Sequence, residues 1–238
     1  MARSDALPSS FLRRTVLYRA LEREGARFEE IDGAAVAMNY GRSLEDERVQ
    51  ASKLGLADLS PLARIGFKGA ETITWLRKQG VEIGEHNNEA WVQPDGELAA
   101  RLADNEVLIL GNITSASDLC ERLERACSFD SAPRCYPVPR RESYAWFIVS
   151  GAQTSAMFAK LCGVDLRVEK FPAGSVAQTS VARMSAIVIR HDLNDVPAFD
   201  LLFDSASADY LWACLRDAMR EFDGGPIGLA ALQALARR

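Results

Sequence analysis

Apolar positions near the N-terminus recur at the spacing of an amphipathic helix. Leu17 and Leu21 fall on one face of the segment 10–24. Ser10 can cap the start of this segment, and Gly25 can take the left-handed conformation that ends a helix. The pattern therefore predicts a helix over 10–24.

Short polar signals follow this segment. The dipeptide Asp32–Gly33 predicts a two-residue hairpin turn between two short strands. The run Ser43-Leu44-Glu45-Asp46 resembles a capping box that opens a second helix, which Gly55 can close.

The rest of the chain shows one pattern twice, first over 65–83 and again over 148–166. In each copy a strand runs into Gly-Ala-[Glu/Gln]-Thr, a helix follows, and Gly-Val-[Glu/Asp]-[Ile/Leu] ends it. The later elements also correspond. The first copy predicts strands near 89–93 and 106–110 and a helix over about 115–127; the second predicts strands near 176–190 and 198–203 and a helix over about 205–222.

Both copies therefore have the order strand-helix-strand-strand-helix. We expect an α+β fold of two similar ferredoxin-like lobes, with helices on one face of each sheet. Pro133, Pro137 and Pro139 mark the seam, because proline disfavours a continued helix and cannot donate to a central strand. The predicted division is an N-terminal segment plus first lobe over 1–138 and a second lobe over 139–238, with segments that can be exchanged between the lobes.

Composition narrows the classes of function. The 238 residues are 48% hydrophobic and 26% charged, with a formal net charge of −5, which is typical of a soluble globular protein. Basic residues form isolated pairs rather than a stripe, so nucleic acid is not the expected partner. No apolar run approaches the roughly 18 residues of a membrane span, and no signal sequence is recognisable. We therefore expect a cytoplasmic protein with no membrane partner.

Few residues are suited to metal or nucleophilic chemistry. His86 and His191 are the only histidines, and the five cysteines contain no Cys-x-x-Cys pair, so no metal site is expected. No glycine-rich phosphate loop is present. The loop that begins at His191 can either place a carboxylate beside the imidazole or serve only as a turn.

A polar set precedes the apolar run that ends at Arg190. It consists of Gln178, Thr179, Ser180 and Arg183. Arginines on a central strand must be paired if they are buried, or must face a ligand, a cleft or a partner. Gln178, Arg183 and Arg190 are therefore the candidate residues for a cleft or an interface.

Several of these stretches resemble a known family. Gly55 to Gly69 resembles the segment near the start of the glycine-cleavage aminomethyltransferases, where Gly-Leu/Val-x-Asp-x-Ser precedes a strand. The second half resembles the gamma subunit of heterotetrameric sarcosine oxidase, most specifically in Phe171-Pro-Ala-Gly-Ser-Val-Ala-Gln-Thr179. The resemblance implies an aminomethyltransferase folate-binding-type fold within an oxidase that demethylates sarcosine or another N-methyl amine. It implies that the complex contains flavins and tetrahydrofolate, bound mainly by larger flavin- and folate-binding partner subunits. It implies no cofactor in the isolated chain.

The chain departs from the transferase pattern at two places. Where the transferases carry Gly-Gly-x-x-Asp-Asp, this chain has Ala99 and Ala100 at the acidic positions. The transferases' Gly-Tyr-x-Gly-Glu, whose Glu holds the pterin, is not recognisable between Arg190 and Phe199. An alanine cannot hold or polarise a folate-borne amine.

We therefore expect a non-catalytic gamma-type subunit of an oxidoreductase complex, with no catalytic residue of its own. The alternative is a stand-alone, tetrahydrofolate-binding aminomethyltransferase-like protein or one-carbon transferase. In that alternative, Arg183 and Arg190 would hold the glutamate tail or the pterin.

Overall fold

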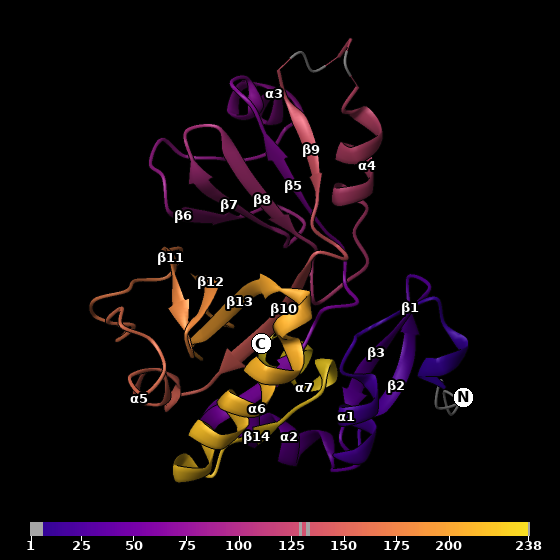
Figure 1. The fold of residues 1–238 in the computed structure, drawn as a ribbon, viewed down its shortest axis with the longest axis vertical. Helices are drawn as coiled ribbons and strands as arrows, with labels where there is room; N and C mark the ends of the chain where they lie inside the picture. The colour runs from indigo at the N-terminus through magenta and orange to yellow at the C-terminus, as the bar shows by residue number, and fades with distance from the viewer. Residues whose placement is uncertain (1–6, 129, 132–133, 238) are drawn as a thin grey trace.

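The computed structural model describes residues 7–128, 130–131 and 134–237, so the predicted seam residue Pro133 lies outside the described residues (Figure 1). The strands are β1 (Arg13–Arg14), β2 (Arg27–Ile31), β3 (Ala34–Asn39), β4 (Gly55–Asp58), β5 (Arg64–Lys68), β6 (Glu89–Val92), β7 (Leu98–Ala103), β8 (Glu106–Leu110), β9 (Tyr136–Pro139), β10 (Tyr144–Ser150), β11 (Val176–Val181), β12 (Met184–Arg190), β13 (Ala198–Asp204) and β14 (Gly225–Pro226). The α-helices are α1 (Tyr18–Arg23), α2 (Leu44–Leu54), α3 (Thr72–Lys78), α4 (Leu119–Ala126), α5 (Thr154–Phe158), α6 (Ala208–Met219) and α7 (Leu229–Ala236).

Two of the sheets have the same arrangement of strands. The order is β6-β7-β8-β5 in the first lobe, and β9 follows β5; in the second lobe it is β11-β12-β13-β10, and β4 and β14 follow β10. In each lobe a helix, α3 or α5, follows the first strand, and a longer helix, α4 or α6, follows the last hairpin. Figure 1 shows the first lobe at the top and the second lobe below it. The predicted α+β fold of two similar lobes is confirmed.

The glycine turns that open α3 and α5 are alike in detail. Gly69 and Gly151 have φ values of 142° and 115°. A Cβ on Gly69 would lie 2.0 Å from the carbonyl oxygen of Arg134, and one on Gly151 would lie 2.5 Å from that of Lys53. Both positions therefore require glycine, for the backbone conformation and for the close approach of a second segment.

Each lobe has one strand more than the sequence predicted. The predicted strand over 176–190 is the hairpin β11–β12, whose turn residues Ala182 and Arg183 have φ values of 48° and 69°. Neither residue is a usual left-handed turn former, so the turn carries no sequence signal. Strand β7 was not predicted, because Leu98–Ala103 contains no β-branched or aromatic residue.

The N-terminal segment is less helical than predicted. The predicted helix over 10–24 is wrong in its first half: α1 begins at Tyr18, and β1 pairs in parallel with β3. The Thr15 hydroxyl accepts the backbone N–H of Leu17 at 3.1 Å, which separates the strand from the helix. Extended pairing with β3 therefore outweighs the helical spacing of the apolar residues.

Two shorter N-terminal predictions are confirmed. Asp32 and Gly33, with φ values of 49° and 72°, form the turn between β2 and β3. At the start of α2, Ser43 Oγ accepts the backbone N–H of Asp46 at 3.1 Å. Gly55 follows α2 as expected, but its backbone is extended and begins β4.

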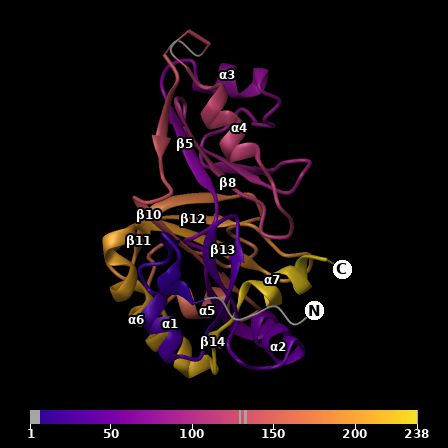
Figure 2. The same cartoon turned by 90° about the vertical axis from the view of Figure 1, so that its right-hand side faces the viewer.

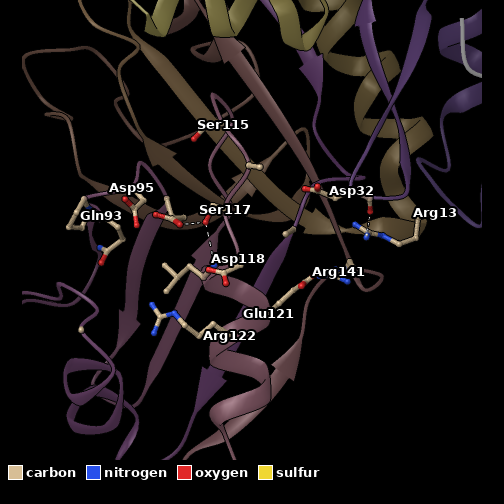
Figure 3. A pocket seen from close by; sticks show the side chains of 16 residues that line it. Arg13, Asp32, Gln93, Asp95, Ser115, Ser117, Asp118, Glu121, Arg122 and Arg141 are labelled. Carbon is tan, nitrogen blue, oxygen red and sulfur yellow. Dashed lines mark hydrogen bonds between the residues drawn. The ribbon is translucent and has the colours of Figure 1, made fainter. Parts of the chain in front are cut away.

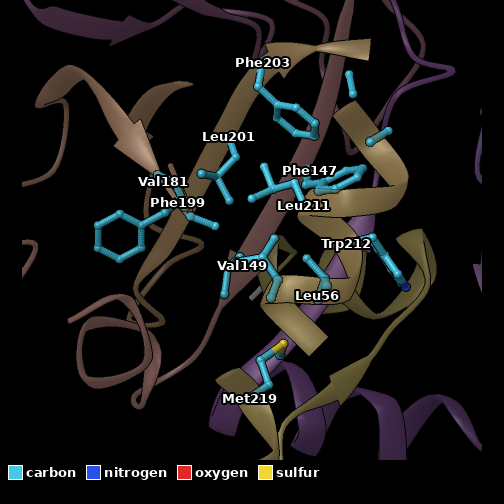
Figure 4. Packing of buried hydrophobic residues seen from close by; sticks show 14 of the residues in the cluster. Leu56, Phe147, Val149, Val181, Phe199, Leu201, Phe203, Leu211, Trp212 and Met219 are labelled. Carbon is cyan, nitrogen blue, oxygen red and sulfur yellow. The ribbon is translucent and has the colours of Figure 1, made fainter. Parts of the chain in front are cut away.

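Strand β10 separates two cores. On one face, Phe147 packs at 4.8 Å from Phe203 and 5.4 Å from Trp212 of α6, measured between ring centroids (Figure 4). On the other face, Trp146 and Ile148 belong to an apolar cluster that also contains residues of β6, β7, β8 and α7. Both faces of this aromatic strand are therefore covered.

Arg64 forms hydrogen bonds with both of the chain segments that connect the two lobes. Its guanidinium donates to the backbone carbonyls of Ser60 and Leu62 on one segment and of Arg140, Arg141 and Tyr144 on the other. Burial lowers its pKa to about 10, so it stays protonated at neutral pH.

Helix α7 was not predicted from the sequence. It begins after Gly228, whose backbone N–H donates to Glu47 Oε2 at 2.8 Å and where a Cβ would lie 1.9 Å from the carbonyl oxygen of Met38. The helix packs against α2 and β3. In the part of the chain that the structure describes, no helix is long and apolar enough to cross a bilayer.

Candidate functional site

The inner faces of the two sheets meet in one apolar cluster. It joins Leu98, Leu102 and Leu108 of the first lobe to Ile187 and Leu202 of the second. Apolar side chains of both sheets therefore pack together between the lobes.

Ala99 and Ala100, which the resemblance aligns with two acidic residues of the transferases, lie in apolar cores. Ala100 belongs to the cluster between the sheets, and Ala99 faces the separate core of the first lobe. Both are fully buried. A carboxylate at either position would lose its hydration in an apolar surround.

Asp200 brings one carboxylate into the middle of β13. It is 1% exposed, and the Trp146 indole N–H donates to its Oδ1 at 2.7 Å. Its Oδ2 has no hydrogen-bond partner among the described residues, and His191 Nδ1 lies 3.6 Å away. The sequence analysis missed Asp200, although a carboxylate in the middle of an otherwise apolar strand is an unusual signal.

The side chain of His191 remains 18% exposed, whereas that of Asp200 is buried. Of the two readings of His191 left open by the sequence, the structure therefore places a carboxylate beside the imidazole. That carboxylate is Asp200 of β13 rather than a member of the loop that begins at His191.

Arg190 lies at the end of β12 and is buried. Its guanidinium makes a bidentate ion pair with Asp192, at 2.8 and 2.6 Å, and donates to the carbonyl oxygens of Val168 and Phe171 at 2.8 and 2.7 Å. These bonds hold the loop before β11 against the strand. These bonds pair the side chain as expected for a buried arginine.

Gln178 and Arg183 lie apart from Arg190. Gln178 is on the edge strand β11 and donates to Asn88 Oδ1 and the carbonyl oxygen of Leu102, at 2.9 and 2.8 Å. Arg183 is exposed in the turn between β11 and β12, near the start of α6. The structure therefore does not gather the three candidate residues into one site.

A cleft of about 580 Å³, here called the inter-sheet cleft, contains part of the predicted polar set. Its floor is the end of the second sheet, and Leu102 and Glu106 of the first lobe lie on its other side. Arg140 stacks on the ring of Tyr144 at 4.4 Å and pairs with Glu106 at 3.1 Å. The remaining lining residues are Gln178, Thr179, Ser180, Ser185, Ala186, Ile187, Leu202, Phe203 and Asp204. This combination of an apolar floor and a hydroxyl-rich rim suits a small, partly polar group.

A second, more polar cleft of about 890 Å³ lies between the β2–β3 turn, the β6–β7 turn and the start of α4. Figure 3 shows Arg13 and Arg141 with Asp32 and Glu121 on one side, and Asp95, Ser117, Asp118 and Arg122 on the other. Arg13 donates to two backbone carbonyls, of Asp32 and Pro61. The cleft carries charges of both signs, so its residues do not select one class of ion.

Metal-binding and thiol chemistry have little support in the described residues. No group of three or more His, Cys, Asp or Glu side chains there is arranged to hold a metal ion. All five cysteines are free thiols. Burial raises the pKa of Cys120 to about 12 and that of Cys127 to about 11, which suppresses the reactive thiolate at neutral pH.

Similar solved structures share the fold. The aminomethyltransferase T of the glycine cleavage system from Bartonella henselae matches with a TM-score of 0.70 and 18% identity, over 94% of this chain and 62% of that one. A chain of the heterotetrameric sarcosine oxidase from Corynebacterium sp. U-96 matches with a TM-score of 0.61 and 15% identity, over 76% of this chain and 93% of that one.

Similar sequences agree with this fold. An aminomethyltransferase of Streptomyces avermitilis is 28% identical over 90% of this chain and 57% of its own length, and one of Streptomyces coelicolor is 26% identical over 96% and 63%. The chain thus spans less than two thirds of these relatives. The GCVT N-terminal domain matches residues 17–237. Because that match covers most of the chain, the protein belongs to the family of the GCVT N-terminal domain.

Proposed function

We propose that this chain is a non-catalytic, gamma-type subunit of a sarcosine oxidase-like complex. The observation that carries the proposal is the burial of Ala99 and Ala100 in apolar cores, at the positions where the transferases have two carboxylates. An enzyme that acts on a folate-borne amine needs an acid or a hydrogen-bond acceptor there. The likeness to 93% of a sarcosine oxidase chain supports the same assignment.

In this proposal, larger partner subunits bind the flavin and the tetrahydrofolate and perform the oxidative demethylation of sarcosine or a related N-methyl amine. This chain contributes cleft walls and contact surfaces: Gln178 lines the inter-sheet cleft, Arg183 is exposed at a hairpin tip, and Arg190 positions the loop before β11. The five free thiols are compatible with a cytoplasmic location.

We also propose that the chain divides at residue 138 into a first part (1–138) and a second lobe (139–238), and that one segment of the first part joins the sheet of the second lobe. The proposed boundary falls within β9, and β4 from the 1–138 part pairs with β10 of the 139–238 part. The N-terminal part therefore completes the sheet of the second lobe.

Binding and activity measurements test the function. The isolated chain should produce no peroxide from sarcosine and should bind tetrahydrofolate more weakly than micromolar in calorimetry. Co-expressed with the large flavoprotein subunits of a sarcosine oxidase-like complex, it should co-purify with them at a fixed ratio. Micromolar tetrahydrofolate binding together with aminomethyl transfer by the isolated chain would instead establish the one-carbon transferase alternative.

A further inference from the structure

The N-terminal segment exposes an apolar and basic surface. Leu12 is fully exposed and Val16 is 61% exposed, while the intervening Thr15 is buried. Arg14 lies between them and is also exposed. Exposed residues thus alternate along the segment that contains β1, and two of the three are large and apolar.

Tyr18 links this strand to helix α1. The guanidinium of Arg14 lies 5.1 Å and that of Arg19 5.4 Å from the centre of the Tyr18 ring. Arg14 also donates to the carbonyl oxygen of Phe11, and Arg23 donates to that of Arg19. Hence these three guanidiniums are held by a ring and by backbone carbonyls, with no ion pair to a carboxylate recorded among the described residues.

The same surface has a hollow and an open strand edge. Arg19, Glu22 and Arg23 line a shallow hollow of about 640 Å³. Strand β1 lies at the edge of the sheet β1-β3-β2, so its outer side pairs with no other described strand. An exposed sheet edge beside large apolar side chains favours association unless another surface covers it.

We propose that this N-terminal surface, defined as Leu12, Arg14, Val16, Arg19 and Arg23, docks on an acidic surface of the larger partner subunit. The inference rests on the proposed function. Leu12 and Val16 supply the apolar contact, and the three guanidiniums select carboxylates by charge. The chain as a whole carries a net charge of −5, so this local basic surface differs from the average of the molecule.

A protein partner fits better than an anionic membrane. Glu22 lies between Arg19 and Arg23 in the hollow and would repel lipid phosphates, whereas a protein can place a donor opposite it. Two apolar side chains also give too little insertion for stable membrane binding. Membrane binding is therefore an alternative outcome of the test.

Co-expression with the large subunits of a sarcosine oxidase-like complex tests the proposal. The double variant Leu12→Glu/Arg14→Glu should weaken the dissociation constant at least ~30-fold, the scale of one interface hot spot. Arg19→Glu alone should weaken binding less and should reduce its dependence on salt. Because these side chains are exposed, the melting temperature of the free chain should change little.

A matched control lies in the first lobe. Val92 on β6 is 53% exposed and Lys78 on α3 is exposed. Figure 1 shows β6 in the first lobe, and Figure 2 shows α3 at the opposite end of the molecule from α1. The double variant Val92→Glu/Lys78→Glu carries the same charge change and should bind like the wild type. Equal binding by the wild type and both double variants would overturn the docking surface and leave the proposed function intact.

Two other outcomes also decide the question. If the wild-type chain binds none of the large subunits, both the proposed function and the docking surface are wrong. If the N-terminal variants keep partner binding but lose binding to vesicles of phosphatidylcholine and phosphatidylserine, the surface is a membrane contact instead.

Discussion

The two lobes share their strand order and differ in the origin of the fifth strand. In the first lobe, β9 follows α4 in sequence and pairs with β5. In the second lobe, the same place beside β10 is taken by β4, which precedes the whole first lobe. The first lobe thus completes its sheet locally, whereas the second depends on the N-terminal segment. This dependence explains why Leu17, Leu21 and Phe28 pack into the core of the second lobe.

The inner faces differ as well. The face of the first sheet that is turned toward the second lobe is apolar. Leu98, Ala100 and Leu102 of β7 lie on this face. The second lobe places Asp200 on β13, the equivalent of β8, where the buried residues of this face are Leu108 and Leu110. Similar backbones therefore carry different side-chain chemistry on their inner faces.

The largest expected effect comes from the two turn glycines. Gly69→Ala and Gly151→Ala should each lower the free energy of unfolding by roughly 3–5 kcal/mol, because the new Cβ meets a backbone atom at a positive φ. Gly151→Ala should cost more, since Lys53 belongs to helix α2, whereas Arg134 lies in a turn. Denaturant unfolding measures both.

Gly163 provides the control for this pair. A Cβ there would meet no atom within 4 Å, and its φ is not in the left-handed region. Gly163→Ala should therefore change the free energy of unfolding by less than ~1 kcal/mol. A small change in the free energy of unfolding at either Gly69 or Gly151 would show that the two turns do not constrain the backbone equally.

The fifth strands give the next largest effect. Leu56 of β4 is fully buried in the core of the second lobe, whereas Val138 of β9 lies half-buried on an edge strand. Leu56→Ala should cost about 3 kcal/mol and Val138→Ala about 1 kcal/mol in the free energy of unfolding. Hydrogen exchange should locate the first loss in β10 and the N-terminal segment together. Protection lost in the N-terminal segment alone would contradict the dependence of the second lobe on β4.

The repeat was predictable because its signals are local. Glycine turns at Gly69 and Gly151 and the apolar run of β10 can be read from neighbouring residues. The sequence analysis allowed segments to be exchanged between the lobes but did not identify β4 as one of them, because strand partners are set by contacts between distant segments. Strand β7 was missed because Leu98–Ala103 has little β propensity, so its pairing with β6 and β8 decides its structure. Helix α7 was missed although Leu229–Ala236 consists of strong helix formers.

The candidate site was harder to predict than the fold. Alternation along a strand indicates two faces but does not say which neighbour covers each. Arg190 and Gln178 were therefore grouped, although Arg190 binds Asp192 and Gln178 lines the inter-sheet cleft. Asp200 was missed because its burial depends on strands on both sides of β13.

The smallest expected effect lies where the chain crosses from the second lobe to the first. Asp58 ends β4, and burial raises the pKa of its carboxyl, although hydrogen bonds from Ser60 and Thr15 oppose the shift. A raised pKa in the folded state means that the ionised carboxyl favours unfolding above that pKa. Below the ordinary aspartate pKa, near 4, this penalty is absent.

Asp58→Asn removes the charge and keeps an acceptor for the Ser60 N–H. The variant should therefore be more stable than the wild type at pH 7, by about 1 kcal/mol at most, and the difference should shrink as the pH falls toward 4. Asp195, which is exposed, gives the control, because Asp195→Asn should match the wild type at both pH values. Urea unfolding at pH 7 and pH 4 measures all three proteins. An advantage of Asp58→Asn that grows on acidification would mean that Asp58 is stabilised as a carboxylate at the crossing between the lobes.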